Sequence, residues 1–479
     1  MDSPESFRKE AHKIVDWIAD YYTGIEKYPV KAACKPGSVF AAIPDSPPFE
    51  SESMEKIFGD FESLIMPGMT HWQNPSFFAY FPANSSFPSL LAEMLSSALG
   101  AQCMKWETSP AATELEEAVM IWLKKMVGLP EGFEGVIQDT ASTATLCAIL
   151  SAREKSTGFN TNHDGFGKSA AMRVYCSSEA HSSVEKAVKI AGIGRNNLVK
   201  IGYDDAYRMK PEFLEAAILN DIKNGLKPVC VVAALGTTGS TAVDPLEDIA
   251  VICQKYKVWL HVDAAYAGSA LILPEYRWMI TGIEKADSFV FNPHKWLFTN
   301  FDCSAYYVKD SETLINTFKL VPEYLKTQIP EHVNDYSNWG IQLGRRFRAL
   351  KLWFVIRSFG LNGLQEKLRH HIALAGELKS WIEEHPDFEI MAPPLFSLVC
   401  FRFHPRDTDD TETLNRMNER LLLAVNETGT MYISHTKLGE YYTLRISVSQ
   451  TMVEKKHVKN AWDLIVEKAL FIHNSSIHG

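Results

Sequence analysis

The sequence has 479 residues, more than one hydrophobic core usually holds, so we expect two or three domains. Hydrophobic residues at 46% and charged residues at 22% are near the average for globular proteins, which excludes a disordered or fibrous chain. The formal net charge of −10 argues against a protein that neutralises nucleic acid. No apolar run approaches the roughly 20 residues of a membrane-spanning helix, so we expect no membrane association.

The cysteines and the first residues favour a cytoplasmic location. Eight cysteines are spread along the chain without C-x-x-C spacing or clustering with histidine. This pattern is typical of reduced, mostly buried thiols, and it predicts no metal site. Residues 1–6 are polar and acidic, unlike a secretion signal.

An amphipathic helix opens the chain, because apolar residues recur at helical spacing from Phe7 to Tyr22. The stretch from Tyr28 to Pro48 contains five prolines, so we expect a linker without regular structure. Such an arm either packs on a second subunit or lies on the surface in solvent. We assign residues 1–85 to this helical N-terminal arm and dimerisation segment.

From about residue 110, short apolar runs alternate with helical patterns, as in a parallel sheet covered on both faces. Three runs predict buried strands, and they cover Val229–Leu235, Val258–Val262 and Ser288–Phe291. Residues 86–359 are therefore predicted to form a large α/β domain.

A smaller α/β domain is predicted over residues 360–479. Its pattern mixes helices with two strand-like runs, Leu398–Phe403 and Tyr442–Ser447, and ends in a helix from about Val453.

Two polar residues follow neighbouring strands of the predicted sheet, Asp263 after Val258–Val262 and Lys295 after Ser288–Phe291. Ligands bind beyond the carboxyl ends of such strands. Taken singly, Asp263 also suits a helix N-cap and Lys295 a surface lysine. Together they match the needs of pyridoxal phosphate, a lysine amine for the imine and an acid beside the pyridine nitrogen.

Small hydroxyl residues supply a candidate phosphate site. Thr140–Thr145 follows the strand-like run Gly135–Gln138 and precedes a helical pattern, so its N–H groups can bind phosphate or can serve only as a helix cap. A second such turn is Gly236–Ser240. His181, after the strand-like run Met172–Cys176, is either a structural histidine or stacks on the cofactor ring.

Four motifs follow one another along the chain, and they are Ala180–Ser183, His261–Gly268, Asn292–Trp296 and Leu343–Arg348. In this order they resemble the aromatic-L-amino-acid decarboxylases, the group II pyridoxal-phosphate-dependent family that includes DOPA, tyrosine and tryptophan decarboxylases. The resemblance extends from Phe7 to about Ile465. It implies the fold of the type I pyridoxal-phosphate-dependent transferases, with a mainly parallel sheet in the large domain, and a homodimer with active sites at the interface.

The resemblance also implies a role for each matching position. Lys295 would form the Schiff base, Asp263 would face the pyridinium nitrogen, and His181 would stack on the ring. Further cofactor contacts would come from Ala141, Ser142, Thr238, Ala265, Asn292, His294 and Gly344. The substrate pocket would comprise Trp72, Tyr80, Phe81, Pro82, Ala83 and His181, with Gln102 and Met104 from the partner subunit.

Tyr324 matches the family's proton donor, a tyrosine on a mobile loop that protonates the α-carbon after CO2 has left. The loop would extend to about Asp335. Relatives that form an aldehyde carry phenylalanine at this position or asparagine in place of His181. We therefore expect an arylalkylamine as product, with aldehyde formation by oxidative deamination as the alternative.

The preferred substrate stays open among tryptophan, 5-hydroxytryptophan, tyrosine, DOPA and phenylalanine. Ala83, Gln102 and Met104 depart from the animal pattern of the family. Gly344 is the small residue that accompanies indole substrates in plant relatives, so a large ring is permitted. An aminotransferase is a further alternative, and Arg445 is then the candidate for binding the α-carboxylate, although a structural ion pair also explains it.

Overall fold

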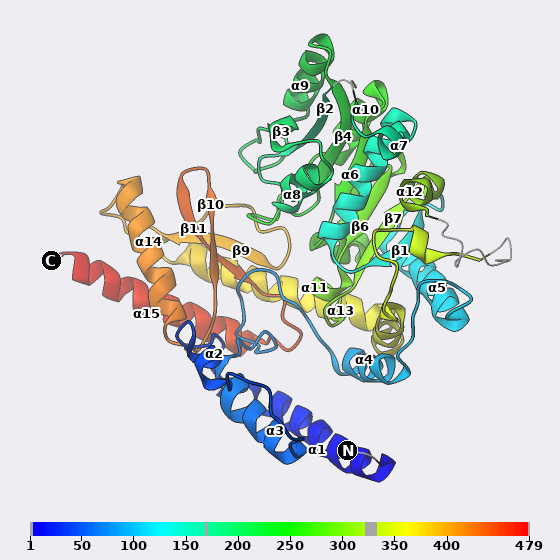
Figure 1. Cartoon of the computed structure of the whole chain (residues 1–479). Helices are drawn as coiled ribbons and strands as arrows, with labels where there is room; N and C mark the ends of the chain where they lie inside the picture. The colour runs from blue at the N-terminus through cyan, green and yellow to red at the C-terminus, as the bar shows by residue number, and fades with distance from the viewer. Residues whose placement is uncertain (1–2, 168–170, 321–332, 478–479) are drawn as a thin grey trace. The chain divides into compact units, whose positions relative to one another are not determined.

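The computed structural model describes residues 3–167, 171–320 and 333–477, and the chain divides into two compact units (Figure 1). We call Ala83–Ala373 with Ala392–Leu398 the sheet unit. The terminal unit comprises Met1–Pro82, Leu374–Met391 and Val399–Gly479. The N-terminal arm and most of the C-terminal segment thus belong to one unit, and a division into three domains at residues 85 and 359 stays a prediction.

A seven-stranded sheet in the order β1-β7-β6-β5-β4-β2-β3 forms the centre of the sheet unit. The strands from β2 to β6 pair in parallel, whereas β7 is antiparallel to both β6 and β1. The strands are β1 (Glu134–Gln138), β2 (Met172–Ser177), β3 (Leu198–Ile201), β4 (Lys227–Ala234), β5 (Trp259–Asp263), β6 (Ser288–Phe291) and β7 (Ser304–Val308). The predicted α/β class is confirmed, and the three predicted runs correspond to β4, β5 and β6.

Helices cover both faces of this sheet. Tyr306 belongs to a buried cluster with residues of α6, α8 and α12, while Tyr307, on the opposite face, donates to the Met120 carbonyl of α5 over 2.9 Å. The helices that begin in this unit are α4 (Phe87–Leu99), α5 (Pro110–Val127), α6 (Ala141–Thr157), α7 (Asn160–Asp164), α8 (Ser183–Ile190), α9 (Pro211–Lys223), α10 (Leu246–Tyr256), α11 (Pro293–Trp296), α12 (Ser311–Phe318) and α13 (Arg348–Glu384, kinked at Gly360), whose residues from Leu374 onward belong to the terminal unit.

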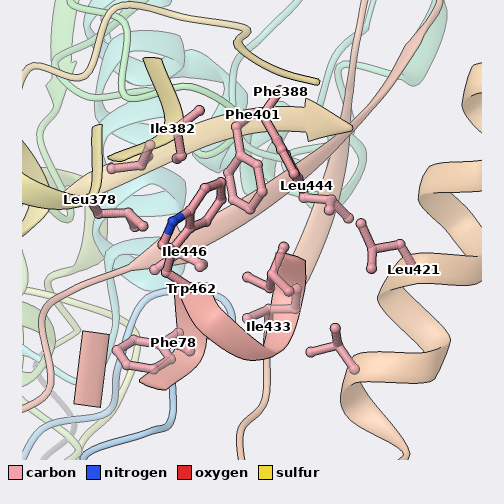
Figure 2. Packing of buried hydrophobic residues seen from close by; sticks show 14 of the residues in the cluster. Phe78, Leu378, Ile382, Phe388, Phe401, Leu421, Ile433, Leu444, Ile446 and Trp462 are labelled. Atoms are coloured by element: carbon pink, nitrogen blue, oxygen red, sulfur yellow. The ribbon is translucent and has the colours of Figure 1, made fainter. Parts of the chain in front are cut away.

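The terminal unit has its own core around a four-stranded sheet in the order β10-β11-β9-β8 (Figure 2). Trp462 of the last helix packs edge-on against Phe388 and Phe401 of the sheet. The strands are β8 (Phe388–Ile390), β9 (Leu398–Phe403), β10 (Ser434–Leu438) and β11 (Tyr441–Ser447), and the helices are α1 (Pro4–Thr23), α2 (Ser38–Ala42), α3 (Met54–Asp60), α14 (Thr411–Asn426) and α15 (Lys455–Ile477). The predicted strands and closing helix are confirmed.

The expectation that Tyr28–Pro48 lacks regular structure was wrong. Helix α2 occupies Ser38–Ala42, between Pro36 and Pro44. Neither proline lies inside the helical turn, so neither removes a hydrogen bond from it.

The expectation of mostly buried thiols is confirmed, since seven of the eight cysteines are buried and Cys34 is exposed, and all eight are free of disulfide bonds. In the described part of the chain, none of the helices has the length and apolar character that crossing a membrane requires.

Candidate active site

Asp263 and Lys295 lie on neighbouring segments at the carboxyl edge of the sheet. Asp263 is the last residue of β5, which pairs in parallel with β6, and Lys295 lies in α11, directly after β6. The N–H of Asn292 donates to the Ala265 carbonyl over 3.0 Å, which keeps the two segments side by side. The expected meeting of these segments at one edge is thus observed.

His181 belongs to the same cluster. Its Nδ1 accepts the backbone N–H of Ser183 over 3.2 Å, so the ring proton sits on Nε2. The ring keeps a solvent-accessible face, yet partial desolvation lowers its pKa, while the Asp263 charge raises it and the Lys295 charge lowers it. Because β2 pairs in parallel with β4 and β4 with β5, the segment that carries His181 follows a strand of the same carboxyl edge as Asp263.

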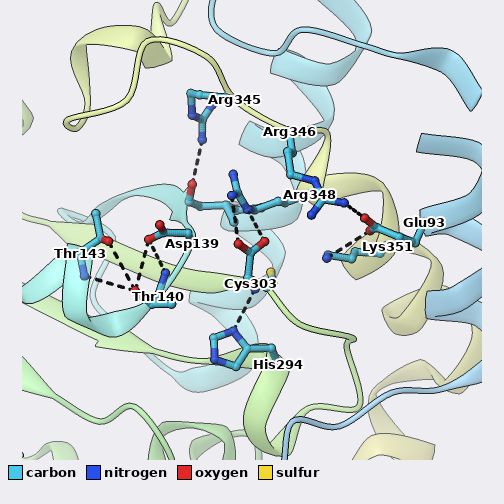
Figure 3. A network of polar contacts seen from close by, with 12 residues as sticks. Glu93, Asp139, Thr140, Thr143, His294, Cys303, Arg345, Arg346, Arg348 and Lys351 are labelled. Atoms are coloured by element: carbon cyan, nitrogen blue, oxygen red, sulfur yellow. Dashed lines mark hydrogen bonds and ion pairs between the residues drawn. The ribbon is translucent and has the colours of Figure 1, made fainter. Parts of the chain in front are cut away.

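The start of α6 supplies backbone donors for an anion. Thr140 caps the helix by accepting the N–H of Thr143, and the N–H of Thr140 is bound by the Asp139 carboxylate (Figure 3). The N–H groups of Ala141 and Ser142 precede the first intrahelical hydrogen bond and point beyond the helix end. Such a helix terminus binds phosphate well.

His294 and Asn292 add side-chain donors next to this helix start. His294 Nδ1 accepts the N–H of Cys303 over 2.9 Å, and burial lowers the pKa of His294 to about 3, so a neutral ring presents Nε2–H (Figure 3). Asn292 Oδ1 accepts the Ser304 hydroxyl over 2.6 Å, which leaves its NH2 end as donor. Because Ser304 pairs with Gln138, at the end of β1, these donors lie beside α6.

This donor set fits the phosphate of pyridoxal phosphate. Neutral N–H donors converge at a helix N-terminus, and a carboxylate and a lysine lie on the adjacent strand ends. Ala265 takes part indirectly, since its N–H donates to Asp263 Oδ1 over 3.0 Å and orients that carboxylate.

Thr238 lies in a tight turn after β4. Gly236 begins the turn with φ of 87°, and a Cβ there would come within 2.6 Å of Ala267 Cβ, so only glycine fits without a shift. Asp244, which the sequence patterns did not single out, accepts the N–H groups of Ala234 and Met209, each over 2.8 Å. This buried carboxylate holds the end of β4, from which the turn starts.

A second set of residues overlooked in the sequence supports His294. Arg348 binds the Asp302 carboxylate through Nε at 2.9 Å and Nη2 at 3.3 Å, and the next residue is Cys303, whose N–H binds His294 (Figure 3). The sequence patterns included Arg348, in the motif Leu343–Arg348, but not Asp302. This ion pair was overlooked because its two residues lie 46 positions apart in the chain.

Gly344 and Gln102 are neighbours in the sheet unit. A Cβ on Gly344 would lie 3.3 Å from Gln102 Nε2, and Gln102 Oε1 accepts the N–H of Arg345 over 2.6 Å. The carbonyl of Met104 accepts the N–H of Ser337 over 2.8 Å. The structure thus places one departure from the family pattern, Gln102, beside the position linked to substrate size.

The other predicted pocket residues, apart from Ala83 in the sheet unit, lie in the terminal unit. Trp72 stacks on Tyr80 at 6.0 Å, and the hydroxyl of Tyr80 lies 3.2 Å from that of Tyr432, a residue the sequence patterns did not indicate. Phe81, followed by the buried Pro82, lies beneath the guanidinium of Arg445 at 5.4 Å. The predicted proton donor Tyr324 is outside the described residues.

Buried histidines predict acid sensitivity of the apoprotein. Burial lowers the pKa of His261 to about 4 and of His294 and His371 to about 3, from an ordinary 6.5. Below pH 6.5 the unfolded chain binds these protons and the folded chain does not, so stability falls as pH falls towards 4. The raised pKa of Asp244, about 6, acts in the opposite direction. Each buried histidine that stays neutral contributes about 1.4 kcal/mol per pH unit to the slope.

Unfolding by urea at several pH values between 6.5 and 4.5 would measure this slope. His371→Asn should reduce it by about 1.4 kcal/mol per pH unit, the contribution of one proton. His12→Asn, on the exposed side of α1, should leave it unchanged. Equal slopes for wild type and His371→Asn would contradict the assignment of His371 as a buried neutral group.

The profile of the pyridoxal-dependent decarboxylase conserved domain matches residues 36–404. The chain belongs to the pyridoxal-dependent decarboxylase family. It is therefore a carboxy-lyase that uses pyridoxal 5′-phosphate, and its fold is that of the type I enzymes.

Relatives of known name cover nearly the whole decarboxylase. Tyrosine decarboxylase 4 of Petroselinum crispum is 43% identical over 97% of this chain and 94% of its own. Phenylacetaldehyde synthase of Arabidopsis thaliana is 45% identical over 98% and 97%. The crystal structure of Oryza sativa TDC with PLP and tryptamine superposes with a TM-score of 0.95 at 36% identity, over 98% of this chain and 99% of that one.

Proposed function

We propose that this decarboxylase converts an aromatic L-amino acid to the corresponding arylalkylamine and CO2. The observation that carries the proposal is the convergence of Lys295, Asp263 and His181 with the phosphate donors at one sheet edge. Relatives named tyrosine decarboxylase and a structural relative holding tryptamine support an aromatic substrate.

In this proposal the protein binds both the phosphate end and the ring end of the cofactor. The N–H groups of Ala141 and Ser142, the amide of Asn292 and the Nε2–H of His294 hold the phosphate, with Thr238 beside the ring. The Asp263 carboxylate faces the ring nitrogen and stabilises its protonated form, and Lys295 supplies the amine. When bound, pyridoxal phosphate withdraws electron density from the bond between the α-carbon and the carboxylate of the substrate.

His181 positions the cofactor and the substrate in this scheme. Its pKa is lowered, so the ring is neutral near pH 7 and does not add a charge next to the electron-withdrawing ring. A flat neutral imidazole can stack on the cofactor face opposite the reacting bonds. Proton delivery to the α-carbon is assigned to Tyr324, from the sequence alone.

The aromatic residues Trp72 and Tyr80, with Phe81, Pro82 and Ala83, are proposed to bind the substrate side chain. Gly344, where a Cβ would lie 3.3 Å from Gln102 Nε2, is proposed to set the limit on ring size together with Gln102, and Met104 is nearby in sequence. As in the plant relatives that the sequence resembles, a glycine here is proposed to permit the indole ring of tryptophan or 5-hydroxytryptophan as well as a phenol.

A homodimer is proposed as the active form, in the cytoplasm. Helix α4 supports it, because five large apolar side chains on this one helix are exposed in the single chain, and these are Phe87, Leu91, Met94, Leu95 and Leu99. Such a patch marks a protein interface.

One alternative product has a specific observation in its favour, since a relative at 45% identity is named phenylacetaldehyde synthase. Arg445, the residue that an aminotransferase would require, instead binds the Ser434 hydroxyl over 3.0 Å within the terminal unit.

A panel of aromatic amino acids with product identification by mass spectrometry tests the proposal. We expect amine and CO2 in equal amounts from at least one substrate, without any requirement for a keto acid. Aldehyde as the main product would replace the proposal with the alternative, and a keto-acid requirement would reject both.

A further inference from the structure

Asn84 is a buried residue, 1% exposed, that lies outside every motif of the sequence. Its backbone N–H donates to the carbonyl of His294 over 3.0 Å, and its side-chain Nδ2 donates to the carbonyl of Lys295 over 2.6 Å. One residue therefore binds two consecutive carbonyls, those of the proposed phosphate ligand and the proposed Schiff-base lysine.

These two carbonyls need donors from outside their own helix. Helix α11 has only four residues, and the last four C=O groups of any helix lack intrahelical partners. The N–H of Leu297 binds the carbonyl of Pro293, the first residue of α11, over 3.0 Å. Asn84 serves the following two carbonyls, so its loss would leave a buried acceptor without this donor.

Trp296, the residue after Lys295, is fixed by contacts with Tyr266 and His371. Trp296 is fully buried, stacks on Tyr266 at 4.8 Å with an angle of 9° between the rings, and donates its Nε1–H to His371 Nδ1 over 3.1 Å. Trp296 thus connects α11 to α13, whereas Asn84 connects it to the segment that precedes α4.

We propose that Asn84 is a positioning residue that holds the peptide units of His294 and Lys295 in place, and with them the point from which the lysine amine reaches the cofactor. The inference rests on the cofactor roles proposed above for His294 and Lys295. Small displacements matter at such a site, because a misplacement of about 1 Å can cost 10²-fold in rate.

Ser86 offers a matched control in the same segment. Its hydroxyl donates to the carbonyl of Phe298 over 2.7 Å, and its side chain is also buried. Ser86→Ala therefore removes one buried side-chain hydrogen bond to the same chain region, as Asn84→Ala does. The bond of Ser86, however, ends three residues beyond Lys295.

The test is the affinity of the full-length apoprotein for pyridoxal phosphate, measured by titration of the visible absorption band of the lysine-bound cofactor. Asn84→Ala should weaken binding roughly ten-fold, the effect of one lost hydrogen bond in a buried site, while Ser86→Ala should stay within about two-fold of wild type. Both variants should lose similar thermal stability. Equal affinity in the two variants would overturn the proposal.

Two further variants separate the donor from the volume of Asn84. Asn84→Asp keeps the size but places a carboxylate oxygen against the Lys295 carbonyl, and it should bind the cofactor no better than Asn84→Ala. Asn84→Gln keeps an N–H donor on a longer arm and should recover part of the affinity. If Asn84→Ala does not fold, Asn84→Asp takes its place in the comparison with Ser86→Ala.

Lys295→Ala distinguishes failure of this inference from failure of the proposed function. If Lys295→Ala keeps the visible band, the lysine assignment itself is wrong. If that variant loses the band while the Asn84 variants bind like wild type, only the positioning role is wrong.

Discussion

Replacement of Lys295 by alanine should remove the visible band of the bound cofactor and lower turnover by roughly 10³-fold or more. The amine of Lys295 is the nucleophile that holds the cofactor covalently in the proposed site, and alanine has none. The phosphate donors at α6, Asn292 and His294 remain, so the variant should still bind pyridoxal phosphate, now reversibly and without the band. Absorption spectra before and after dialysis measure this difference.

Lys186 provides the control for charge. It is an exposed residue of α8 whose charge also acts on His181, so Lys186→Ala removes a nearby ammonium without touching the proposed imine. We expect this variant to keep its band and near wild-type turnover. An intact band in Lys295→Ala would show that another amine holds the cofactor and would require the site to be reassigned.

The sequence was sufficient for the central strands β4, β5 and β6 and for the positions of the charged groups that follow them, but it did not predict β3, β7 or the antiparallel pairing of β7. Buried strands in a parallel sheet are continuous apolar runs, and the residue after each run marks the carboxyl edge. Asp263 and Lys295 follow such runs and do lie on adjacent segments in the structure. The resemblance to a family then supplied the roles that position alone leaves open.

The partners of the site could not be read from the sequence, because they are set by contacts between distant segments. Asn84 binds Lys295 from 211 residues away, and Asp302 receives Arg348 from 46 residues away. Neither Asn84 nor Asp302 lies in a periodic pattern or next to a predicted strand end. Hydrogen bonds of this kind fix tautomers and backbone groups, so they determine geometry without leaving a local motif.

The N-terminal arm shows a different limit of structure prediction from sequence. A count of prolines between Tyr28 and Pro48 predicts irregular backbone, but the effect of proline depends on where it stands relative to a turn. Five residues between Pro36 and Pro44 were enough for α2. Proline content therefore did not predict the short helix α2 within this segment.

Tyr324→Phe should divert most product from amine to aldehyde, with the amine yield reduced at least ten-fold. The phenol is the proposed acid that protonates the α-carbon after CO2 leaves, and general acids contribute roughly 10²- to 10⁴-fold. Without it the electron-rich carbon persists long enough to react with dioxygen. One dioxygen and one water are then consumed for each aldehyde, CO2, ammonia and hydrogen peroxide released, so the carbon is oxidised and dioxygen is reduced.

Mass spectrometry of the organic product, with a peroxidase-coupled assay for hydrogen peroxide, distinguishes the two outcomes in one reaction. Tyr336→Phe is the matched control, because Tyr336 is also a tyrosine near the end of the same chain segment but is buried against the Arg345 guanidinium at 4.8 Å. That variant should still yield amine. An unchanged amine yield in Tyr324→Phe would exclude this phenol as the proton source, and exclusion of dioxygen should suppress the aldehyde without restoring fast amine formation, since the missing proton donor limits that branch.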